Sequence, residues 1–136
     1  TLQPQADVIL CEADGSKHLP CKAPAAHEPV LLPDCDIVLA VAGMDALGRP
    51  LVQACQRPQP AAELLGCSLD SVIDEQMLAA LLLSEQGARK NVGKRTFYIV
   101  LNKCDLLPAA QQEEILRLLV SAGMDEHRIW LRERGE

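Results

Sequence analysis

The sequence predicts an α/β protein: an open, mostly parallel sheet with flanking helices, folded as a single domain over residues 1–136. Two stretches, DIVLAVA at 36–42 and TFYIVL at 96–101, are almost continuously apolar rather than alternating. That pattern is typical of parallel strands that are covered on both faces. Segments with helical spacing lie between the expected strands, and no two strands follow one another directly, which favours this fold class.

Four short apolar segments are expected to form the strands, at 7–11, 36–42, 96–101 and 128–131. The least regular stretches, rich in proline and polar residues, both follow the ends of expected strands. In open α/β sheets, the loops at the carboxyl ends of strands build the ligand site. These two stretches, 15–33 and 47–60, are therefore where a ligand site is expected.

Three helices are expected between these strands. Asp74 is suited to cap the first, and Gly87 is placed to end it. The second begins near Pro108 and stops at Gly123. A shorter helix is expected at 61–65, after a break formed by the two prolines just before it. The positions expected to face the core are Met77, Leu78, Leu81 and Leu82 in the first helix, and Ile115, Leu116, Leu119 and Val120 in the second.

Composition and charge exclude several classes of function. The formal net charge is −6, whereas nucleic-acid binding usually needs a basic face, and only Phe97, Tyr98 and Trp130 are aromatic. No apolar run reaches the ~20 residues that a membrane helix needs. The six cysteines show no C-x-x-C spacing and are expected to be reduced thiols, which indicates a cytoplasmic protein. The three histidines show no zinc-ligand spacing with them.

The sharpest motif is Asn102-Lys103-Cys104-Asp105, which directly follows the expected strand at 96–101. It fits the N-K-x-D signature by which P-loop GTPases read guanine. The Asp105 carboxylate can accept hydrogen bonds from the ring N–H and the exocyclic amine of guanine, a pair of donors that adenine lacks. Lys103 can lie along the base and Asn102 can brace the loop. The alternative is an ordinary loop in which Asp105 caps the following helix.

The second motif, EADGSK, begins at Glu12 at the end of the first expected strand. In P-loop proteins an acid at this place holds Mg²⁺, directly or through water, and a following glycine lets the backbone approach the terminal phosphate. Either Glu12 or Asp14 could be that acid, Gly15 matches the glycine, and Lys17 could face the phosphates. The alternative is an Asp-Gly turn that binds no ligand.

Further cations lie in the expected loops, and each could contact phosphate or a partner protein or be a solvated surface charge. They are Lys22, Arg49, Arg57, Arg89 and Lys90. The glycine-rich G-x-x-x-x-G-K-[ST] loop that cradles phosphates is absent from the sequence. The chain is therefore expected to be the C-terminal part of a P-loop NTPase-like domain that begins mid-domain. By itself it is not expected to hydrolyse nucleotide.

Several strings in the sequence are long and specific: EADGSKHLPCKAP at 12–24, HEPV at 27–30, VAGMDALGRPL at 41–51, Arg57-Pro58, GARK at 87–90 and VLNKCD at 100–105. Over nearly its whole length the chain resembles the YqeC-type family of accessory proteins for selenium-dependent molybdenum hydroxylases. The resemblance implies a P-loop NTPase-like protein associated with maturation of these hydroxylases. Family members normally carry a glycine-rich, lysine-containing phosphate loop near the N-terminus, and this chain departs from the family there.

Two functions are the main expectations. In the first, the chain is part of an accessory factor that binds a nucleotide, GTP with Mg²⁺, and acts with a molybdenum hydroxylase or its cofactor machinery. In the second, it is an interaction domain that docks a hydroxylase or a molybdenum-cofactor carrier and binds no nucleotide. A third reading is a transferase that acts on the pterin-nucleotide cofactor itself.

Overall fold

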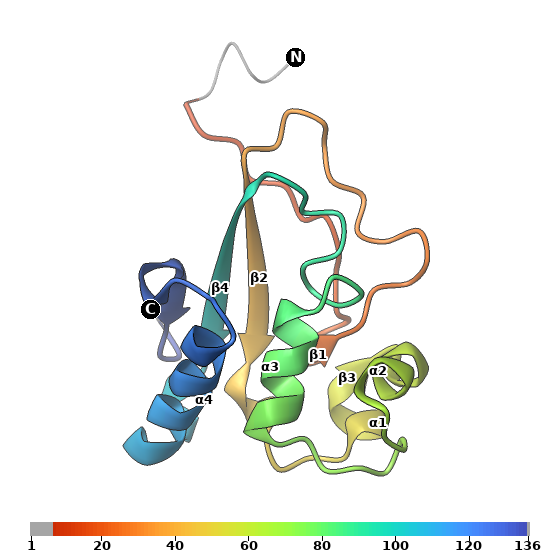
Figure 1. Ribbon diagram of the computed structural model, residues 1–136, viewed down its shortest axis with the longest axis vertical. Helices are drawn as coiled ribbons and strands as arrows, with labels where there is room; N and C mark the ends of the chain where they lie inside the picture. Colours follow the sequence, from red (N-terminus) through yellow and green to blue (C-terminus); the bar gives the residue numbers. More distant parts are fainter. Residues whose placement is uncertain (1–6, 136) are drawn as a thin grey trace.

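The computed structural model describes residues 7–135 and confirms the α/β class (Figure 1). The expected strands at 36–42, 96–101 and 128–131 are all present, and α4 follows Pro108. The strands are β1 Cys21–Lys22, β2 Ile37–Gly43, β3 Cys55–Gln56, β4 Thr96–Asn102 and β5 Ile129–Leu131. The helices are α1 Leu51–Ala54, α2 Pro58–Leu65, α3 Glu75–Leu83 and α4 Ala109–Ser121, with 3-10 helices at Met44–Ala46, Cys104–Leu106 and Glu126–Arg128.

The strands form two parallel sheets. The main sheet has the order β2-β4-β5, and Gly43 at the end of β2 lies opposite Asn102 at the end of β4. The smaller sheet pairs β1 with β3, with Cys21 opposite Cys55. Because β2 and β4 are parallel and in register, their carboxyl ends meet at one place. We call this place, marked by Gly43 and Asn102, the carboxyl edge of the sheet.

Helices α3 and α4 lie over one face of the main sheet (Figure 1). The side chains of Ile99 and Leu101 in β4 are 0% exposed on this face, as are Leu78 of α3 and Leu119 of α4. All four belong to one hydrophobic core cluster. Burying an aliphatic side chain of this size contributes roughly 1.5–3 kcal/mol, so this layer contributes much of the stability of the domain.

The opposite face of the main sheet is not covered by any part of the chain that the structure describes. On β2 the side chains that point to this face are Ile37, Leu39 and Val41, and they are 54%, 46% and 61% exposed. Their neighbours Ala40 and Ala42 are buried on the helical side. The prediction that both faces are covered is therefore wrong for residues 7–135.

The prediction of a strand at 7–11 is also wrong. These residues pair with no strand between residues 7 and 135, and Val8 and Leu10 are 74% and 86% exposed. A strand needs a neighbour to satisfy its backbone hydrogen bonds, and an apolar sequence alone does not supply one. The structure instead has β1 and β3 inside the stretches expected to be irregular. Each contains two residues, too few to show any periodicity.

The helix boundaries follow local chemistry. Asp74 caps α3, because its side chain accepts a hydrogen bond from the Met77 amide at 2.8 Å. The helix ends before Gly87, where the chain folds back so closely that a Cβ would lie 2.3 Å from the Leu81 carbonyl oxygen. Helix α2 begins at Pro58 rather than after the prolines, because proline fits the first helical turn. None of the described helices is long and apolar enough to cross a membrane.

Candidate functional site

The loop after β4 turns sharply at the carboxyl edge of the sheet. Lys103 has a φ of 63°, a left-handed conformation that is uncommon for residues other than glycine. The Asn102 side-chain oxygen accepts a hydrogen bond from the Lys103 amide at 3.0 Å, which braces the turn. The Lys103 ammonium lies 3.2 Å from Oδ2 of Asp45, in the loop after β2. The loops that follow the two neighbouring strands are thereby joined.

Asp105 is already engaged by the C-terminal segment. Its Oδ1 accepts a hydrogen bond from the Arg134 amide at 2.9 Å, and its Oδ2 lies 2.6 Å from Arg134 Nε. These bonds, the backbone one first, lower the pKa of the Asp105 carboxyl. Asp105 does not cap α4, which follows Pro108. A ligand that used both oxygens of Asp105 would therefore have to displace Arg134.

Asp45 is a site residue that the sequence reasoning missed. Its Oδ2 pairs with Lys103, and its Oδ1 is buried with no hydrogen-bond partner among the described residues. Gly43 makes room for it, because a Cβ on Gly43 would lie 2.5 Å from Oδ1. A signal was present in the sequence: Asp45 follows the apolar run DIVLAVA much as Asp105 follows TFYIVL.

The segment that carries the second motif reaches the same edge of the sheet. The Gly43 amide donates a hydrogen bond to the Pro20 carbonyl oxygen at 2.8 Å. The turn before Pro20 is tight, with Lys17 and His18 both at positive φ (51° and 64°). The motif EADGSK and the loop after β4 are therefore attached to the ends of adjacent strands, although 80 or more residues lie between them in the sequence.

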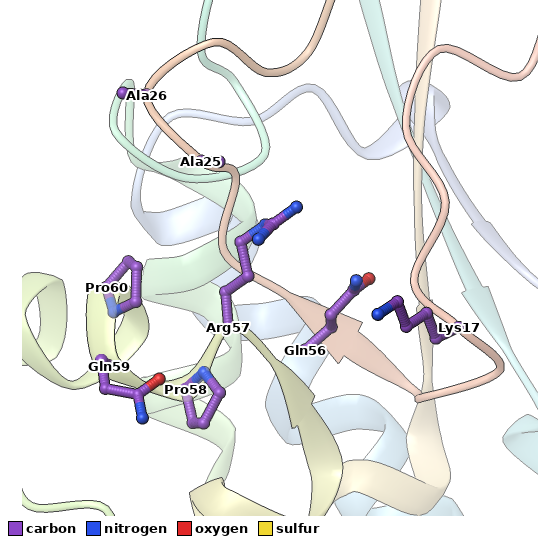
Figure 2. A pocket seen from close by; sticks show the side chains of 8 residues that line it. All are labelled: Lys17, Ala25, Ala26, Gln56, Arg57, Pro58, Gln59 and Pro60. Carbon is purple, nitrogen blue, oxygen red and sulfur yellow. The ribbon is translucent and has the colours of Figure 1, made fainter.

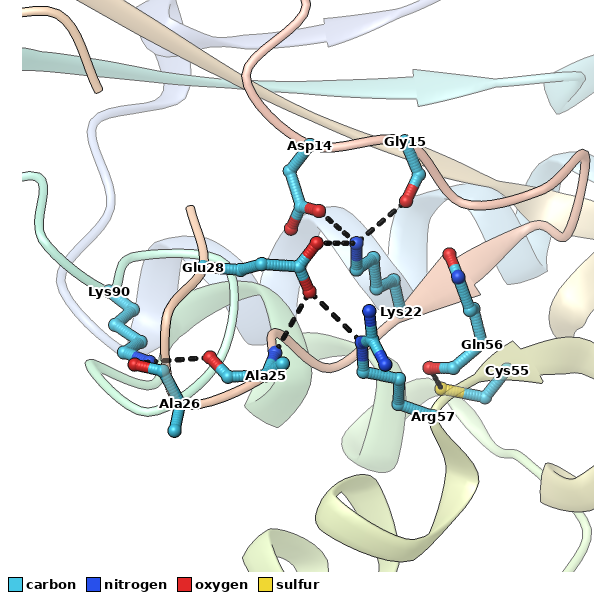
Figure 3. A network of polar contacts seen from close by, with 10 residues as sticks. All are labelled: Asp14, Gly15, Lys22, Ala25, Ala26, Glu28, Cys55, Gln56, Arg57 and Lys90. Carbon is cyan, nitrogen blue, oxygen red and sulfur yellow. Dashed lines mark hydrogen bonds and ion pairs between the residues drawn. The ribbon is translucent and has the colours of Figure 1, made fainter. Parts of the chain in front are cut away.

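Asp14 and Gly15 belong to a polar network around Lys22 (Figure 3). The Lys22 ammonium forms an ion pair with Asp14, donates to the Gly15 carbonyl oxygen at 2.6 Å, and lies 3.2 Å from Glu28 Oε2. The other oxygen of Glu28 accepts hydrogen bonds from Arg57 Nε at 2.9 Å and from a backbone amide. From the sequence, Lys22 and Arg57 are expected to contact phosphate or a partner protein. In the structure both form ion pairs with acidic side chains of the same chain.

The two acids of this network differ in their protonation. Burial raises the pKa of Asp14, and this effect outweighs its contact with Lys22. A hydrogen bond with the Asp14 carboxyl and one from the Ala25 amide hold the pKa of Glu28 well below its usual range. Glu28 therefore carries the more firmly held negative charge. The sequence reasoning quoted Glu28 only within the string HEPV and assigned it no role in a site.

A surface hollow of about 510 Å³ adjoins the network (Figure 2). Two cations, Lys17 and Arg57, belong to its lining, and the side chains of Lys17 and Gln56 point toward one another across it. Oε1 of Gln56 is buried and has no hydrogen-bond partner among the described residues. The remaining lining comes from Ala25, Ala26, Pro58, Gln59 and Pro60. The hollow therefore presents positive charge beside an unsatisfied acceptor, at the first turn of α2.

Within the described residues, the remaining candidates are exposed without an ion pair or have partners elsewhere in the chain. Glu12 is exposed, and among residues 7–135 it forms no ion pair. Arg49 donates to the Gln53 carbonyl oxygen at 3.2 Å, and the Arg89 guanidinium lies 5.2 Å from the centre of the Phe97 ring. The Lys90 ammonium donates to the carbonyl oxygens of residues 25 and 26. Arg49 and Arg89 therefore contact residues near them in the sequence, whereas Lys90 ties the loop after α3 to residues 25 and 26.

The described residues contain no group of three or more His, Cys, Asp or Glu side chains that could hold a metal ion by themselves. The six cysteines form no disulfide with one another. Three of them, Cys21, Cys55 and Cys104, are buried, whereas Cys11 is exposed. A hydrogen bond between the opposed Cys21 and Cys55 thiols, together with burial, raises the pKa of Cys21.

Fold and geometry define the class: an α/β protein with a parallel sheet and a cluster of charged loops at the carboxyl ends of its strands. Residues 1–59 match the family described as YqeC protein. The chain is 36% identical over 132 residues to "Uncharacterized protein YqeC" of Escherichia coli (strain K12), across 95% of this chain and 51% of that protein. These two matches support the YqeC family for this chain. The chain spans about half the length of this curated relative, and no solved structure matches it.

Proposed function

We propose that this chain supplies the base-side and metal-side loops of a guanine-nucleotide site in a YqeC-family protein. One observation carries the proposal: the loops after β2 and β4 and the segment that contains EADGSK converge on the carboxyl edge of the sheet. The bond from Gly43 to Pro20 and the ion pair between Lys103 and Asp45 hold them there. In open parallel sheets, ligands bind at this edge.

On the base side, Asn102 and Lys103 form a braced turn and Asp105 would accept the two guanine donors. An aspartate is ionised at neutral pH, and the bonds from Arg134 lower the pKa of Asp105 further. An ionised carboxylate is the acceptor that guanine requires. The pair between Asp105 and Arg134 is largely exposed, with side chains 26% and 60% accessible. Exposed ion pairs contribute little to stability, so guanine can replace Arg134 at low cost.

On the phosphate side, Glu12 fits a Mg²⁺ site better than Asp14. Mg²⁺ usually keeps several waters and takes one or two carboxylates in addition to phosphate oxygens. Glu12 is exposed and available, whereas Asp14 is paired with Lys22. Bound Mg²⁺ would neutralise phosphate charge. Lys17 and Arg57, which line the hollow beside this segment, would pair with the remaining phosphate oxygens.

The role that we propose for this site is in the maturation of selenium-dependent molybdenum hydroxylases in the cytoplasm. Support comes from the resemblance of the long strings at 12–24 and 41–51 to the accessory proteins of these enzymes. Nucleotide binding would order the loops at the carboxyl edge, and a hydroxylase or its cofactor machinery would sense that order.

Calorimetric titration with Mg-GTP and Mg-ATP tests the base assignment, on this chain and in parallel on the full-length Escherichia coli relative. We expect tighter binding of GTP, and at least a tenfold loss of GTP affinity in Asp105→Asn. The matched control is Arg134→Ala, which removes the side-chain bond to Oδ2 of Asp105 but keeps the amide bond to Oδ1, and it should preserve or raise GTP affinity. Equal affinity for both nucleotides, unchanged in Asp105→Asn, would remove the guanine assignment.

A second candidate function is supported by the internal contacts of the acids. Asp14 and Asp105, two of the acids considered for metal and base, both have protein partners in this structure. A domain that docks a hydroxylase or a molybdenum-cofactor carrier without nucleotide would keep such contacts. Biolayer interferometry with a purified selenium-dependent molybdenum hydroxylase separates the two functions. Docking that is independent of added GTP, in a protein with no measurable nucleotide affinity, favours this second function.

A further inference from the structure

The uncovered face of the main sheet is a continuous apolar surface. Leu39 lies opposite Tyr98, Val41 lies opposite Val100, and Val100 lies opposite Trp130. Residues directly opposite in a parallel ladder share a face. Val41, Val100 and Trp130 therefore form one row across three strands, and Leu39 and Tyr98 form a second row beside it. The Tyr98 and Trp130 rings are 5.1 Å apart between centres. We call this surface the open face, made of Ile37, Leu39, Val41, Tyr98, Val100 and Trp130.

Much of the open face is accessible to solvent. Leu39, Val41 and Trp130 are 46%, 61% and 47% exposed, although Val100 in the middle of the row is only 7% exposed. Isolated exposed apolar residues are ordinary, but a contiguous apolar patch marks a contact surface. A sheet face in contact with water usually carries polar or charged side chains. The residues of the open face include no Asp, Glu, Lys or Arg.

The outer edge of β2 has no strand beside it among the described residues, although the Gly43 amide at its end donates to the Pro20 carbonyl oxygen. β2 is the first strand in the order β2-β4-β5, and no other strand between residues 7 and 135 pairs with it. It is seven residues long and contains no proline or charge. Natural sheets normally protect such an edge with charged residues, proline or a covering element. The sequence of β2 is therefore typical of an interior strand, with a neighbouring strand on each side.

A third feature lies on the same side of β2. In Figure 1 the segment from residue 7 to β1 runs from near the start of β2 toward its carboxyl end, on the side away from β4. It reaches that end where Pro20 bonds to Gly43. Val8 and Leu10 in this segment are 74% and 86% exposed. The apolar residues 7–11 and the outer edge of β2 thus both lack a neighbouring strand among the described residues.

We propose that the open face and the outer edge of β2 are covered by polypeptide from the part of a YqeC-length protein that lies outside the matched region. The occupant is a parallel strand that pairs with β2, together with an apolar helix that packs on the open face. The relative has room for both, because this chain covers only 51% of it. This proposal does not depend on nucleotide binding.

A second copy of this chain is a less suitable occupant. In a two-fold dimer the same surface of each copy contacts the other, and the two-fold rotation reverses the strand direction. A dimer through β2 would therefore place the two β2 strands antiparallel. The main sheet is wholly parallel, and purely parallel sheets are preferred over mixed ones. A strand from the same polypeptide can continue the parallel sheet, and its covalent link gives it a high effective concentration.

Substitutions on the open face test the proposal by comparing two contexts. In this chain, Leu39→Lys and Val41→Lys should leave the melting temperature nearly unchanged, since the two side chains are 46% and 61% exposed. At the aligned positions of the full-length Escherichia coli relative, the same change should lower it by roughly 5 °C or more, because a charge would then be buried. Val120→Lys, at a 40% exposed position on α4, is the control and should be neutral in both proteins.

Amide hydrogen exchange of the unsubstituted proteins tests the proposal independently, because it does not require any variant to fold. The β2 amides should exchange faster in this chain than in the full-length relative, while the β4 amides should be protected in both. Equal exchange of β2 in the two proteins, or neutral open-face substitutions in the relative, would overturn the proposal. A dimer of this chain in analytical ultracentrifugation that Val41→Lys dissociates would assign the face to a second copy instead.

Discussion

Two charged clusters, the network around Lys22 and the pair of Asp105 with Arg134, are built from similar residue types but are placed in different surroundings. Around Lys22, the side chains are 12% accessible for the lysine and 17% for Asp14 and Glu28. In the other cluster, Asp105 and Arg134 are 26% and 60% accessible. The first cluster connects segments around β1 and β3, and the second ties a loop to the end of the chain.

The difference separates a structural network from an exchangeable contact. Removing one partner from a buried ion pair lowers stability strongly, because the remaining charge stays buried and unpaired. A solvated ion pair is screened and can exchange its partner for a ligand at little cost. Of the acids considered for binding, Asp14 is therefore the more structural and Asp105 the more available.

The largest effect is expected from Lys22→Met, which would leave Asp14 and Glu28 facing one another without their shared cation. We expect the free energy of unfolding to fall by about 2–4 kcal/mol, as for the loss of one partner of a largely buried ion pair. Lys17→Met is the matched control, because Lys17 is exposed and belongs to no ion pair among the described residues. Chemical denaturation measures both. Similar losses in the two variants would show that the network around Lys22 is no more structural than a surface charge.

The next effect concerns Gly43, which lies between Pro20 and the Asp45 side chain. Gly43→Ala would place a Cβ 2.5 Å from Asp45 Oδ1 and 3.1 Å from Pro20 Cβ, so we expect a loss of about 1–3 kcal/mol from overpacking. Asp45→Ala removes the closer contact. The double variant should therefore lose less than the sum of the two single variants. Strict additivity in a denaturation cycle would contradict the crowding seen between Gly43 and Asp45.

A smaller effect, dependent on pH, is expected from Glu28. Its pKa is held below the ordinary value of 4.5, so its ionised form stabilises the folded state above that pH. This contribution falls as the pH drops below 4.5 and through the lowered pKa. Asp14 acts in the opposite direction, because its raised pKa favours proton uptake by the folded state above the ordinary value of 3.8.

Glu28→Gln should therefore lower the melting temperature at neutral pH and flatten its decline between pH 5 and the acid limit of folding. Asp14→Asn should cost less at neutral pH, because the charged form of Asp14 is already disfavoured by burial. The exposed Glu85 provides a control through Glu85→Gln. An acid profile of Glu28→Gln that coincides with that of the wild-type protein would exclude Glu28 as a stabilising charge.

The smallest effect is expected from Asp105→Asn on the free protein. Because the pair with Arg134 is exposed, the melting temperature should stay within measurement error at neutral pH. The same variant is expected to weaken GTP binding, so stability and binding should respond separately at Asp105. A marked fall in melting temperature would instead place Asp105 with the structural network, and the contrast between the clusters would disappear.

Several elements could be predicted from sequence because their causes are local. The apolar runs DIVLAVA and TFYIVL gave β2 and β4, and Asp74 marked the start of α3 because its side chain reaches an amide only three residues away. The prolines at 58 and 60 were misinterpreted as a break. A proline in the first helical turn needs no hydrogen-bond donor, so they begin α2 instead.

What only the tertiary structure decided depends on contacts between distant residues. Lys103 pairs with Asp45 across 58 residues, and Arg57 pairs with Glu28 across 29, and no local pattern records either partner. The sequence alone established apolar strands with acids at their ends. The three-dimensional structure decided that helices cover only one face of the main sheet between residues 7 and 135, because burial depends on which segments are present to pack against each face.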